Sequence, residues 1–439
     1  MPVPQTPGWA VLPFVLYLFL IAVLPLFLGR FWDHNRNKLA LALVAATPVV
    51  IYLLGSRPGG AAMLLETARE YAAFMALLAA LFVISGGIYV RGAFAGSPIV
   101  NTSFLAIGAI LASLIGTTGA SALLIRPLLR ANERRRHTRH VVIFFIFIVA
   151  NGAGLLTPLG DPPLFLGFLR GVPFLWTLRL AAPWALVNGT LLMVFALVDR
   201  YFHRREPVLS IVPPRPVEPL RIEGKLNLVW LLGVIATVFL VGTYGERLFA
   251  SRALRSAMQI GGMLLFAGLS VKTTSRQIHE DNRFSWAPML EVAVVFIGIF
   301  LTMVPALTYL EERGASLGIT LPWQFFWASG ALSSVLDNAP TYLTFASLAS
   351  GVADGGRGVL TVSDLGALAL HATGRHLLAA VSCGSVFMGA ITYIGNGPNF
   401  MVKAIAEQHH VRMPSFFGYM LWSLTILVPV FAVVALVFF

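Results

Sequence analysis

The chain is poor in charged residues and in cysteine. Asp, Glu, Lys and Arg make up 11% of its 439 residues, and Cys383 is the only cysteine. A single thiol excludes an intrachain disulfide and any structural zinc site built from several cysteines. Cys383 could bind a soft metalloid, but it stands among small residues, where a thiol usually serves packing.

Signatures of soluble catalysis and of nucleic-acid binding are missing as well. The sequence contains no His-Glu-x-x-His motif and no Walker phosphate-binding loop, which argues against metalloprotease chemistry and against ATP-driven transport by this chain alone. Its formal net charge is +12, but the basic residues stand in short loops between apolar runs. That distribution is typical of membrane orientation signals rather than of a nucleic-acid surface.

Apolar residues are what the chain has in abundance. They make up 57% of the sequence, the mean hydropathy is +0.81, and many runs approach the roughly 20 residues that cross a bilayer. We therefore expect an all-α polytopic membrane protein, whose first apolar run, 9–29, is a membrane helix and not a cleaved signal. The ten crossings are expected at 9–29, 39–54, 71–89, 141–168, 174–198, 226–241, 258–271, 288–310, 377–406 and 416–438.

Residues 151–163 form a polar interruption in one of the most apolar regions. This run, Asn-Gly-Ala-Gly-Leu-Leu-Thr-Pro-Leu-Gly-Asp-Pro-Pro, contains three prolines and three glycines, so it cannot continue a regular helix. Within a membrane, freed backbone groups are tolerated only where protein or water covers them, and an ionisable group such as Asp161 is costly. The run predicts a buried polar site at an interrupted helix.

The second half of the chain repeats this pattern. The motif Gly-x-x-Thr-x-x-Gly-Asp-x-Pro at 154–163 has the spacing of Gly-x-x-Thr-x-x-Gly-Asn-x-Pro at 389–398. A polar-tipped pair of segments around Gly116 likewise corresponds to a pair around Asp337. We predict a first repeat at 1–199, a linker at 200–225 and a second repeat at 226–439.

The distribution of Lys and Arg predicts how the repeats are oriented. If each polar-tipped pair, at about 102–130 and 321–350, is a re-entrant hairpin, each half crosses the membrane about five times and the halves are inverted. The loops with most of the Lys and Arg then all lie on the cytoplasmic side. Inverted repeats with discontinuous helices are typical of secondary transporters.

The two acidic residues at the breaks are the main candidates for ion binding. Asp161 precedes a half-helix opened by two prolines, where it could be only an N-cap or also an ion or proton site. Asp337 is followed by Asn338 and Thr341, and these oxygen ligands suit sodium. We expect the ion or proton site to comprise Asp337, Asn338, Thr341, Asp161, Thr157 and Asn151, with further lining by Gly116, Thr117, Thr118, Ser121, Thr392, Gly395, Asn396 and Asn399.

Other polar residues are weaker candidates. Glu291 could carry a proton, but its charged neighbours favour an interfacial residue. The histidine pairs 371/376 and 409/410 stand in segments that read as solvated loops rather than metal sites.

The break motif and the later Leu-Asp-Asn-x-Pro-Thr run resemble those of the ion transporter superfamily that includes NhaD-type sodium/proton antiporters, arsenite permeases and citrate transporters. The closest likeness is to the NhaD-like and citrate-transporter branch. The resemblance implies a homodimer in which the hairpins and broken helices form a transport part that moves against a scaffold part. The hairpin tips here differ from the Ser-Asn-Thr tips of the sodium/dicarboxylate branch, which argues against a dicarboxylate substrate.

Taken together, these features predict a secondary transporter and not an enzyme. We expect a sodium or other monovalent cation/proton antiporter, because no Lys or Arg stands within the four motifs to hold an anion. The alternative is a sodium- or proton-coupled symporter of citrate or another organic anion, whose carboxylates half-helix N-termini could bind. A membrane-embedded enzyme or passive channel would not require inverted breaks. No cofactor is expected besides the transported ions, and the expected location is a bacterial inner membrane.

Overall fold

The computed structural model describes residues 5–92, 95–207, 221–249, 251–282, 284–313, 316–355 and 357–439. Nearly all of this part of the chain is helical, which confirms the expected all-α membrane class. It contains 11 helices long and apolar enough to span a membrane. Ten of them coincide with the ten expected crossings, and the eleventh is the first arm of the hairpin around Gly116.

The first half contains nine helices and three short 3-10 segments among the described residues: η1 (Gly8–Val11), α1 (Leu12–Phe27), α2 (Gly29–Trp32), α3 (Asn35–Ser56), α4 (Gly60–Gly86), α5 (Pro98–Ile115), α6 (Thr117–Ala131), α7 (Arg139–Ile148), η2 (Gly152–Leu156), α8 (Pro162–Leu169), η3 (Phe174–Leu180) and α9 (Ala181–His203). The described part of the second half has the same order of long elements: α11 (Leu226–Leu248), α12 (Arg252–Thr273), α13 (Arg276–Asp281), α14 (Ala287–Arg313), α15 (Pro322–Ser333), α16 (Asn338–Ala353), η5 (Val362–Asp364), α17 (Leu365–Leu370), α18 (Gly374–Met388), η6 (Gly389–Ile391), α19 (Gly397–Gln408) and α20 (Phe416–Phe438).

Helix α4 begins earlier than its hydropathy suggested. It starts at Gly60 rather than near residue 71, and its first turns carry Glu66, Arg69 and Glu70. These charges remain helical because they are paired: Arg69 lies 3.3 Å from Glu66, and Glu70 lies 2.7 Å from Arg170. The expected start near residue 71 was too late because hydropathy excludes charged residues, and here the fold pairs their charges.

A two-stranded ribbon was not predicted. Strand β1 (Tyr89–Arg91) pairs antiparallel with β2 (Arg221–Glu223), and Arg91 forms an ion pair of 3.1 Å with Glu223. The segment expected as a linker, 200–225, therefore includes the end of α9 and a strand, while 208–220 lies outside the described residues. The prolines of this segment indicated a linker, so the short strand β2 was not expected.

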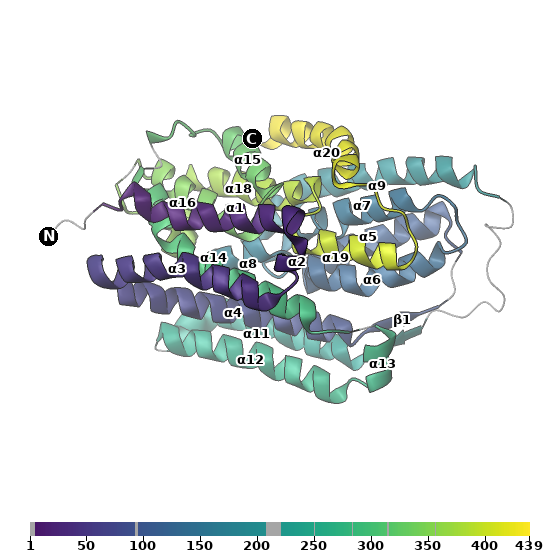
Figure 1. Cartoon of the computed structure of the whole chain (residues 1–439), viewed down its shortest axis with the longest axis horizontal. Helices are drawn as coiled ribbons and strands as arrows, with labels where there is room; N and C mark the ends of the chain where they lie inside the picture. Colours follow the sequence, from purple (N-terminus) through teal and green to yellow (C-terminus); the bar gives the residue numbers. More distant parts are fainter. Residues whose placement is uncertain are drawn as a thin grey trace.

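The helices form two groups. One, the scaffold part, consists of α1, α3, α4, α11, α12 and α14, which pack mainly on one another. The other group consists of α5–α9 and α15–α20. It contains the hairpins and broken helices expected to form a transport part, and we use that name for it below. The groups meet where α4 packs on α6 and α8 and where α14 packs on α16. In Figure 1, α3, α4, α11 and α12 lie below α9, α18 and α20.

The two helical hairpins enter the transport part from opposite ends. The base of α5–α6 lies near the end of α9 and the β1–β2 ribbon, which we call the linker end. The base of α15–α16 lies at the other end, where α14 finishes and Arg57 forms an ion pair of 3.1 Å with Glu312. Opposed hairpins are the arrangement expected of inverted repeats (Figure 1).

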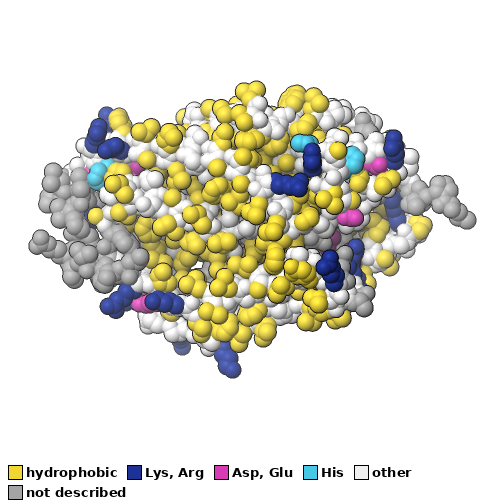
Figure 2. Space-filling model, turned by 180° about the vertical axis from the view of Figure 1, so that it is seen from behind, with side chains coloured by type: hydrophobic (Ala, Val, Ile, Leu, Met, Phe, Trp, Pro, Cys, Tyr) yellow, Lys and Arg dark blue, Asp and Glu magenta, His cyan; other side chains and the backbone are white. Residues whose placement is uncertain are grey.

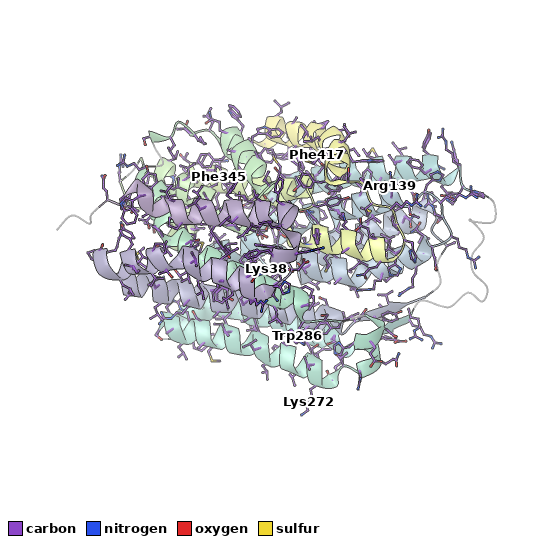
Figure 3. The ribbon with its side chains drawn as sticks, in the orientation of Figure 1. Lys38, Arg139, Lys272, Trp286, Phe345 and Phe417 are labelled. Carbon is purple, nitrogen blue, oxygen red and sulfur yellow. The ribbon has the colours of Figure 1, made fainter. Side chains whose placement is uncertain are left out.

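Charge and apolar surface separate along the molecule. Hydrophobic side chains dominate the middle of the face in Figure 2, and Lys and Arg gather toward its ends. Lys38, labelled in Figure 3, is a buried exception on α3, and its Nζ lies 2.6 Å from Glu291 of α14. Glu291 therefore pairs within the scaffold part, apart from the helix breaks. The pattern is that of an integral multi-pass membrane protein.

Candidate functional site

The first helix break leaves Asp161 free to face the other elements. Helix α7 ends at Ile148 and α8 begins at Pro162, with η2 and a turn between them. Pro162 and Pro163 occupy the first turn of α8 and have no N–H to offer. Asp161 stands at the N-cap position, but its carboxylate accepts no cap hydrogen bond from its own helix.

The tip of the first hairpin closes onto this break. Gly116 adopts φ +79°, a conformation that favours glycine, and a Cβ there would lie 3.2 Å from the Leu159 carbonyl oxygen. The next residue, Thr117, donates its N–H to the Gly160 carbonyl at 2.8 Å and its hydroxyl to Asp161 Oδ1 at 2.9 Å. Thr118 is half-buried beside them.

Asp161 joins elements of both repeats. Its side chain is buried, and besides Thr117 it accepts hydrogen bonds from the Asn338 amide of the second hairpin and, at 3.4 Å, from Asn396 of the second break. Among the described residues, none of the ion pairs involves Asp161 or Asp337. A carboxyl group thus lies at the meeting point of two hairpin tips without a basic partner.

The second hairpin tip presents oxygen atoms to the same region. Asp337 caps α16 by accepting the Ala339 N–H at 3.1 Å, and its carbonyl accepts the Thr341 hydroxyl at 3.0 Å. Asn338 is fully buried, and its Oδ1 has no hydrogen-bond partner. The buried hydroxyl of Ser121, one turn beyond the first tip, also has none. Such unsatisfied buried oxygens are rare and mark places where an ion or water can bind.

Asn151, Asn396 and Asn399 hold the two breaks together. Asn151 Nδ2 donates to Asn399 Oδ1 at 2.7 Å, and Asn396 Nδ2 lies 3.3 Å from Asn151 Oδ1. Asn399 gives both amide hydrogens to carbonyls of its own break, those of Gly389 and Thr392. The polar atoms of Asn151 and Asn399 are therefore engaged in holding the backbone.

The break threonines anchor each break to a hairpin in the same way. Thr157 donates its hydroxyl to the Ser113 carbonyl, and Thr392 donates its hydroxyl to the Ser334 carbonyl at 2.5 Å. Both carbonyls belong to the end of the first arm of the respective hairpin. Gly395 permits close packing here, because a Cβ would meet the Gly389 carbonyl oxygen at 2.6 Å.

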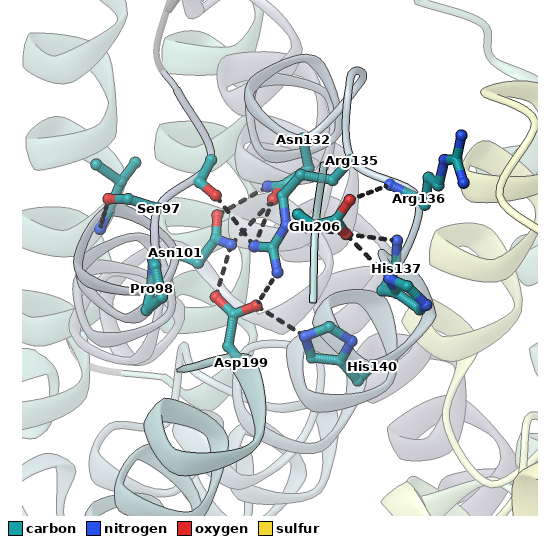
Figure 4. Close-up of polar contacts among 12 residues, drawn as sticks. Ser97, Pro98, Asn101, Asn132, Arg135, Arg136, His137, His140, Asp199 and Glu206 are labelled. Atoms are coloured by element: carbon teal, nitrogen blue, oxygen red, sulfur yellow. Dashed lines mark hydrogen bonds and ion pairs between the residues drawn. The ribbon is translucent and has the colours of Figure 1, made fainter. Parts of the chain in front are cut away.

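A buried charged cluster at the linker end fixes the base of the first hairpin. Asp199 of α9 accepts hydrogen bonds from Arg135 at 2.6 Å, His140 at 2.8 Å and Asn101 at 2.9 Å (Figure 4). Burial disfavours the charge of nearby Glu206, but the N–H groups of Arg136 and His137 donate to its carboxylate and lower its pKa.

Sequence reasoning did not identify this cluster, although an acid and a histidine in apolar segments were the available signal. It also missed four side chains that donate to carbonyls of the breaks: Trp184, Asn188, Tyr419 and Ser423. The predicted site residues, by contrast, converge at the two tips and two breaks. Asp337 differs from Asp161 in being half-buried and in capping its own helix.

Comparison with known proteins places the whole chain in one family. The family model described as "Putative citrate transport" matches residues 3–439. No curated protein matches the sequence.

Proposed function

The chain belongs to the "Putative citrate transport" family of the ion transporter superfamily, and on this premise we propose that it is a membrane transporter rather than an enzyme, and specifically a sodium (or other monovalent cation)/proton antiporter. The observation that carries the proposal is the buried carboxyl of Asp161, which no basic side chain of the described chain pairs. A buried charge requires a partner, and here a mobile cation or a proton would supply it.

Competition at one group explains exchange. A sodium ion prefers hard oxygen ligands, and Asp161, the Thr117 hydroxyl and the unpartnered Oδ1 of Asn338 are of that kind. A proton on Asp161 removes the charge that holds the cation. Binding of one therefore displaces the other, and alternating exposure of the site to the two sides would couple their opposite movements.

An elevator-type movement agrees with the two groups of helices. The transport part carries both tips and both breaks, and among the described residues few polar contacts bind it to the scaffold part. One is the ion pair between Arg170, at the end of α8, and Glu70 of α4 at 2.7 Å, and another is the hydrogen bond from the Val362 N–H to Glu311 of α14. We expect these contacts to break as the transport part moves.

Crosslinking can test this movement. Leu307 of α14 and Ser347 of α16 lie next to each other at the interface, since the Ser347 hydroxyl donates to the Leu307 backbone carbonyl. Cysteines at both positions, in a Cys383→Ser background, should stop transport when crosslinked and release it on reduction. Unchanged transport by the crosslinked protein would contradict an elevator.

Symport of citrate is the second candidate, and it is consistent with the family description. The N-terminus of α19, which begins with Gly397, could bind a carboxylate without a basic side chain, whereas the two prolines that open α8 leave that helix with fewer N–H groups for an anion. In that case the Asp161 region would hold the coupling ion. None of the ion pairs of the described residues involves Asp161, which fits antiport better, because a trivalent anion would add charge of the same sign near this carboxyl.

Proteoliposome assays separate the two candidates. An imposed sodium or lithium gradient should change the internal pH of vesicles that contain the protein, and protein-free vesicles provide the control. Uptake of labelled citrate with no cation-driven pH change would overturn antiport in favour of symport. The resemblance also leads us to propose a homodimer in a bacterial inner membrane, which mass measurement in native lipid can check.

A further inference from the structure

Two helices outside the four motifs each place a pair of hydrogen-bond donors against a break. On α9, Trp184 Nε1 donates to the Ala153 carbonyl at 3.1 Å, and Asn188 Nδ2 donates to the Gly152 carbonyl at 3.1 Å. The members of the pair are four residues apart, so they lie on one face of the helix.

Helix α20 repeats the arrangement at the second break. The Tyr419 hydroxyl donates to the Ala390 carbonyl at 2.8 Å, and the Ser423 hydroxyl donates to the Ile391 carbonyl at 2.6 Å. Tyr419 follows Thr392 at the same distance along the chain as Trp184 follows Thr157, and Ser423 corresponds to Asn188 in the same way. The residue types differ between the repeats, but the donor function is the same.

These donors act on backbone carbonyls at the two places where a regular helix is interrupted. At membrane depth an unsatisfied carbonyl is costly, and a carbonyl oxygen with no donor is also a potential ligand for a hard cation. A side chain that engages such an oxygen satisfies it and at the same time withdraws it from the ion. We propose that Tyr419 and Ser423, with Trp184 and Asn188, are positioning residues that fix the break carbonyls and thereby set the cation selectivity of the site.

The second break transmits this positioning to Asp161. The Ala390 carbonyl belongs to η6, whose Gly389 carbonyl accepts the Asn399 amide at 2.8 Å. Asn399 in turn accepts a hydrogen bond from the Asn151 amide, and the Asn151 side-chain oxygen accepts one from Asn396. Asn396 also donates to Asp161. A shift of η6 therefore alters one of the three hydrogen bonds that Asp161 accepts.

The carbonyls of the two breaks differ in how many side chains donate to them. The Ala153 carbonyl also accepts the Ser113 hydroxyl at 2.5 Å, so loss of the Trp184 donor leaves it satisfied. Among the described residues, the Ala390 carbonyl accepts a hydrogen bond from one side chain, that of Tyr419. The second break should therefore be the more sensitive one, and Tyr419 the more critical residue.

Removal of one hydroxyl tests the proposal. Tyr419→Phe is compared with Trp184→Phe and with Tyr17→Phe, whose hydroxyl donates to the Val295 carbonyl at 3.0 Å in the scaffold part. Tyr17 and Tyr419 are both fully buried, so the control loses the same kind of hydrogen bond in a similar setting. Ser423→Ala is a second variant at the same break, in case Tyr419→Phe does not fold.

Two measurements on the full-length protein are needed. Hydrogen exchange of residues 389–399 should rise about fivefold in Tyr419→Phe or Ser423→Ala, as expected for one lost hydrogen bond, and should stay at the wild-type level in Tyr17→Phe. The ratio of apparent affinities for sodium and lithium in proteoliposomes should shift by about threefold or more in the same two variants only. Trp184→Phe should change both measures less.

The inference depends on the proposed cation site, and the two can fail separately. If wild-type protein shows no cation-driven proton flux, antiport is wrong, while exchange at residues 389–399 still tests the positioning role. If exchange and selectivity in Tyr419→Phe and Ser423→Ala equal those of Tyr17→Phe, the positioning role is overturned even when antiport is confirmed.

Discussion

Replacement of Asp161 by Asn removes the charge of the site while it keeps the size of the side chain. Asp161 accepts three donors, from Thr117, Asn338 and Asn396, and an amide has only one oxygen to offer them. The NH2 group of the introduced asparagine would face the Asn338 Nδ2, so two donors would meet. Since Asn338 Oδ1 has no partner, that amide can turn over and accept instead.

The magnitudes of these effects nearly cancel in the folded state. Three hydrogen bonds to a charged acceptor become neutral ones or are rearranged, at a cost of about 1 kcal/mol each. Against this, the variant no longer buries an unpaired charge, whose burial costs several kcal/mol. We expect the free energy of unfolding of Asp161→Asn to lie within about 2 kcal/mol of the wild-type value.

Cation binding should suffer much more than stability. Loss of the single charged ligand should weaken sodium binding by about 3 kcal/mol, which is at least a hundredfold in apparent affinity, and should abolish the exchange for protons. The assay combines thermal unfolding in detergent with sodium-driven pH change in proteoliposomes. Asp337→Asn is the comparison, because asparagine can still cap α16.

Two outcomes would refute this reasoning. If Asp161→Asn transports normally at every pH, the buried carboxyl is structural, and the charge role passes to Asp337. If the variant unfolds far more easily than the wild type, its carboxylate is a structural acceptor whose charge the fold requires. Retained stability with lost coupling is the combination that the site geometry predicts.

Three further predictions concern the surroundings of the site. Gly116→Ala should destabilise the protein by about 1–3 kcal/mol in thermal unfolding, because φ +79° with ψ 150° is a backbone conformation used almost only by glycine. Gly189→Ala on α9, where a Cβ meets nothing within 4 Å, should not destabilise it. Arg135→Gln should cost about 3–5 kcal/mol, because the buried Asp199 carboxylate loses its arginine partner and keeps His140 and Asn101 as donors, and addition of Asp199→Asn should restore part of the loss in a double-mutant cycle. Folding lowers the pKa of Glu206, so its charge stabilises the protein above the ordinary glutamate pKa, and this contribution is lost as pH falls through the lowered pKa. The unfolding temperatures of wild type and Glu206→Gln should therefore differ at neutral pH and converge as pH falls below about 4.

The sequence was sufficient for the features that depend on local chemistry. Apolar runs identified the ten crossings, because a bilayer demands length and hydropathy. The prolines and glycines of 151–163 identified a break, since no regular helix accommodates them. Hydropathy failed where distant partners neutralise charge, as at the start of α4, where Glu70 pairs with Arg170. It could not reveal the β1–β2 ribbon, which depends on two segments far apart in the chain.

The partners of Asp161 lay beyond sequence reasoning for a related physical reason. The match between the two repeats places Asn396 where Asp161 stands, and symmetry would pair each residue with its own hairpin tip. Asp161 does contact Thr117 of its own tip, but the structure also brings Asn338 of the second hairpin and Asn396 of the second break onto this single carboxyl. Two equivalent carboxyls could not meet at this point without repulsion, so one repeat supplies the acid and the other its amide donors. The difference between Asp161 and Asn396 is therefore what allows two inverted repeats to build one site, and Asn396→Asp should weaken that site by adding a second charge beside the first.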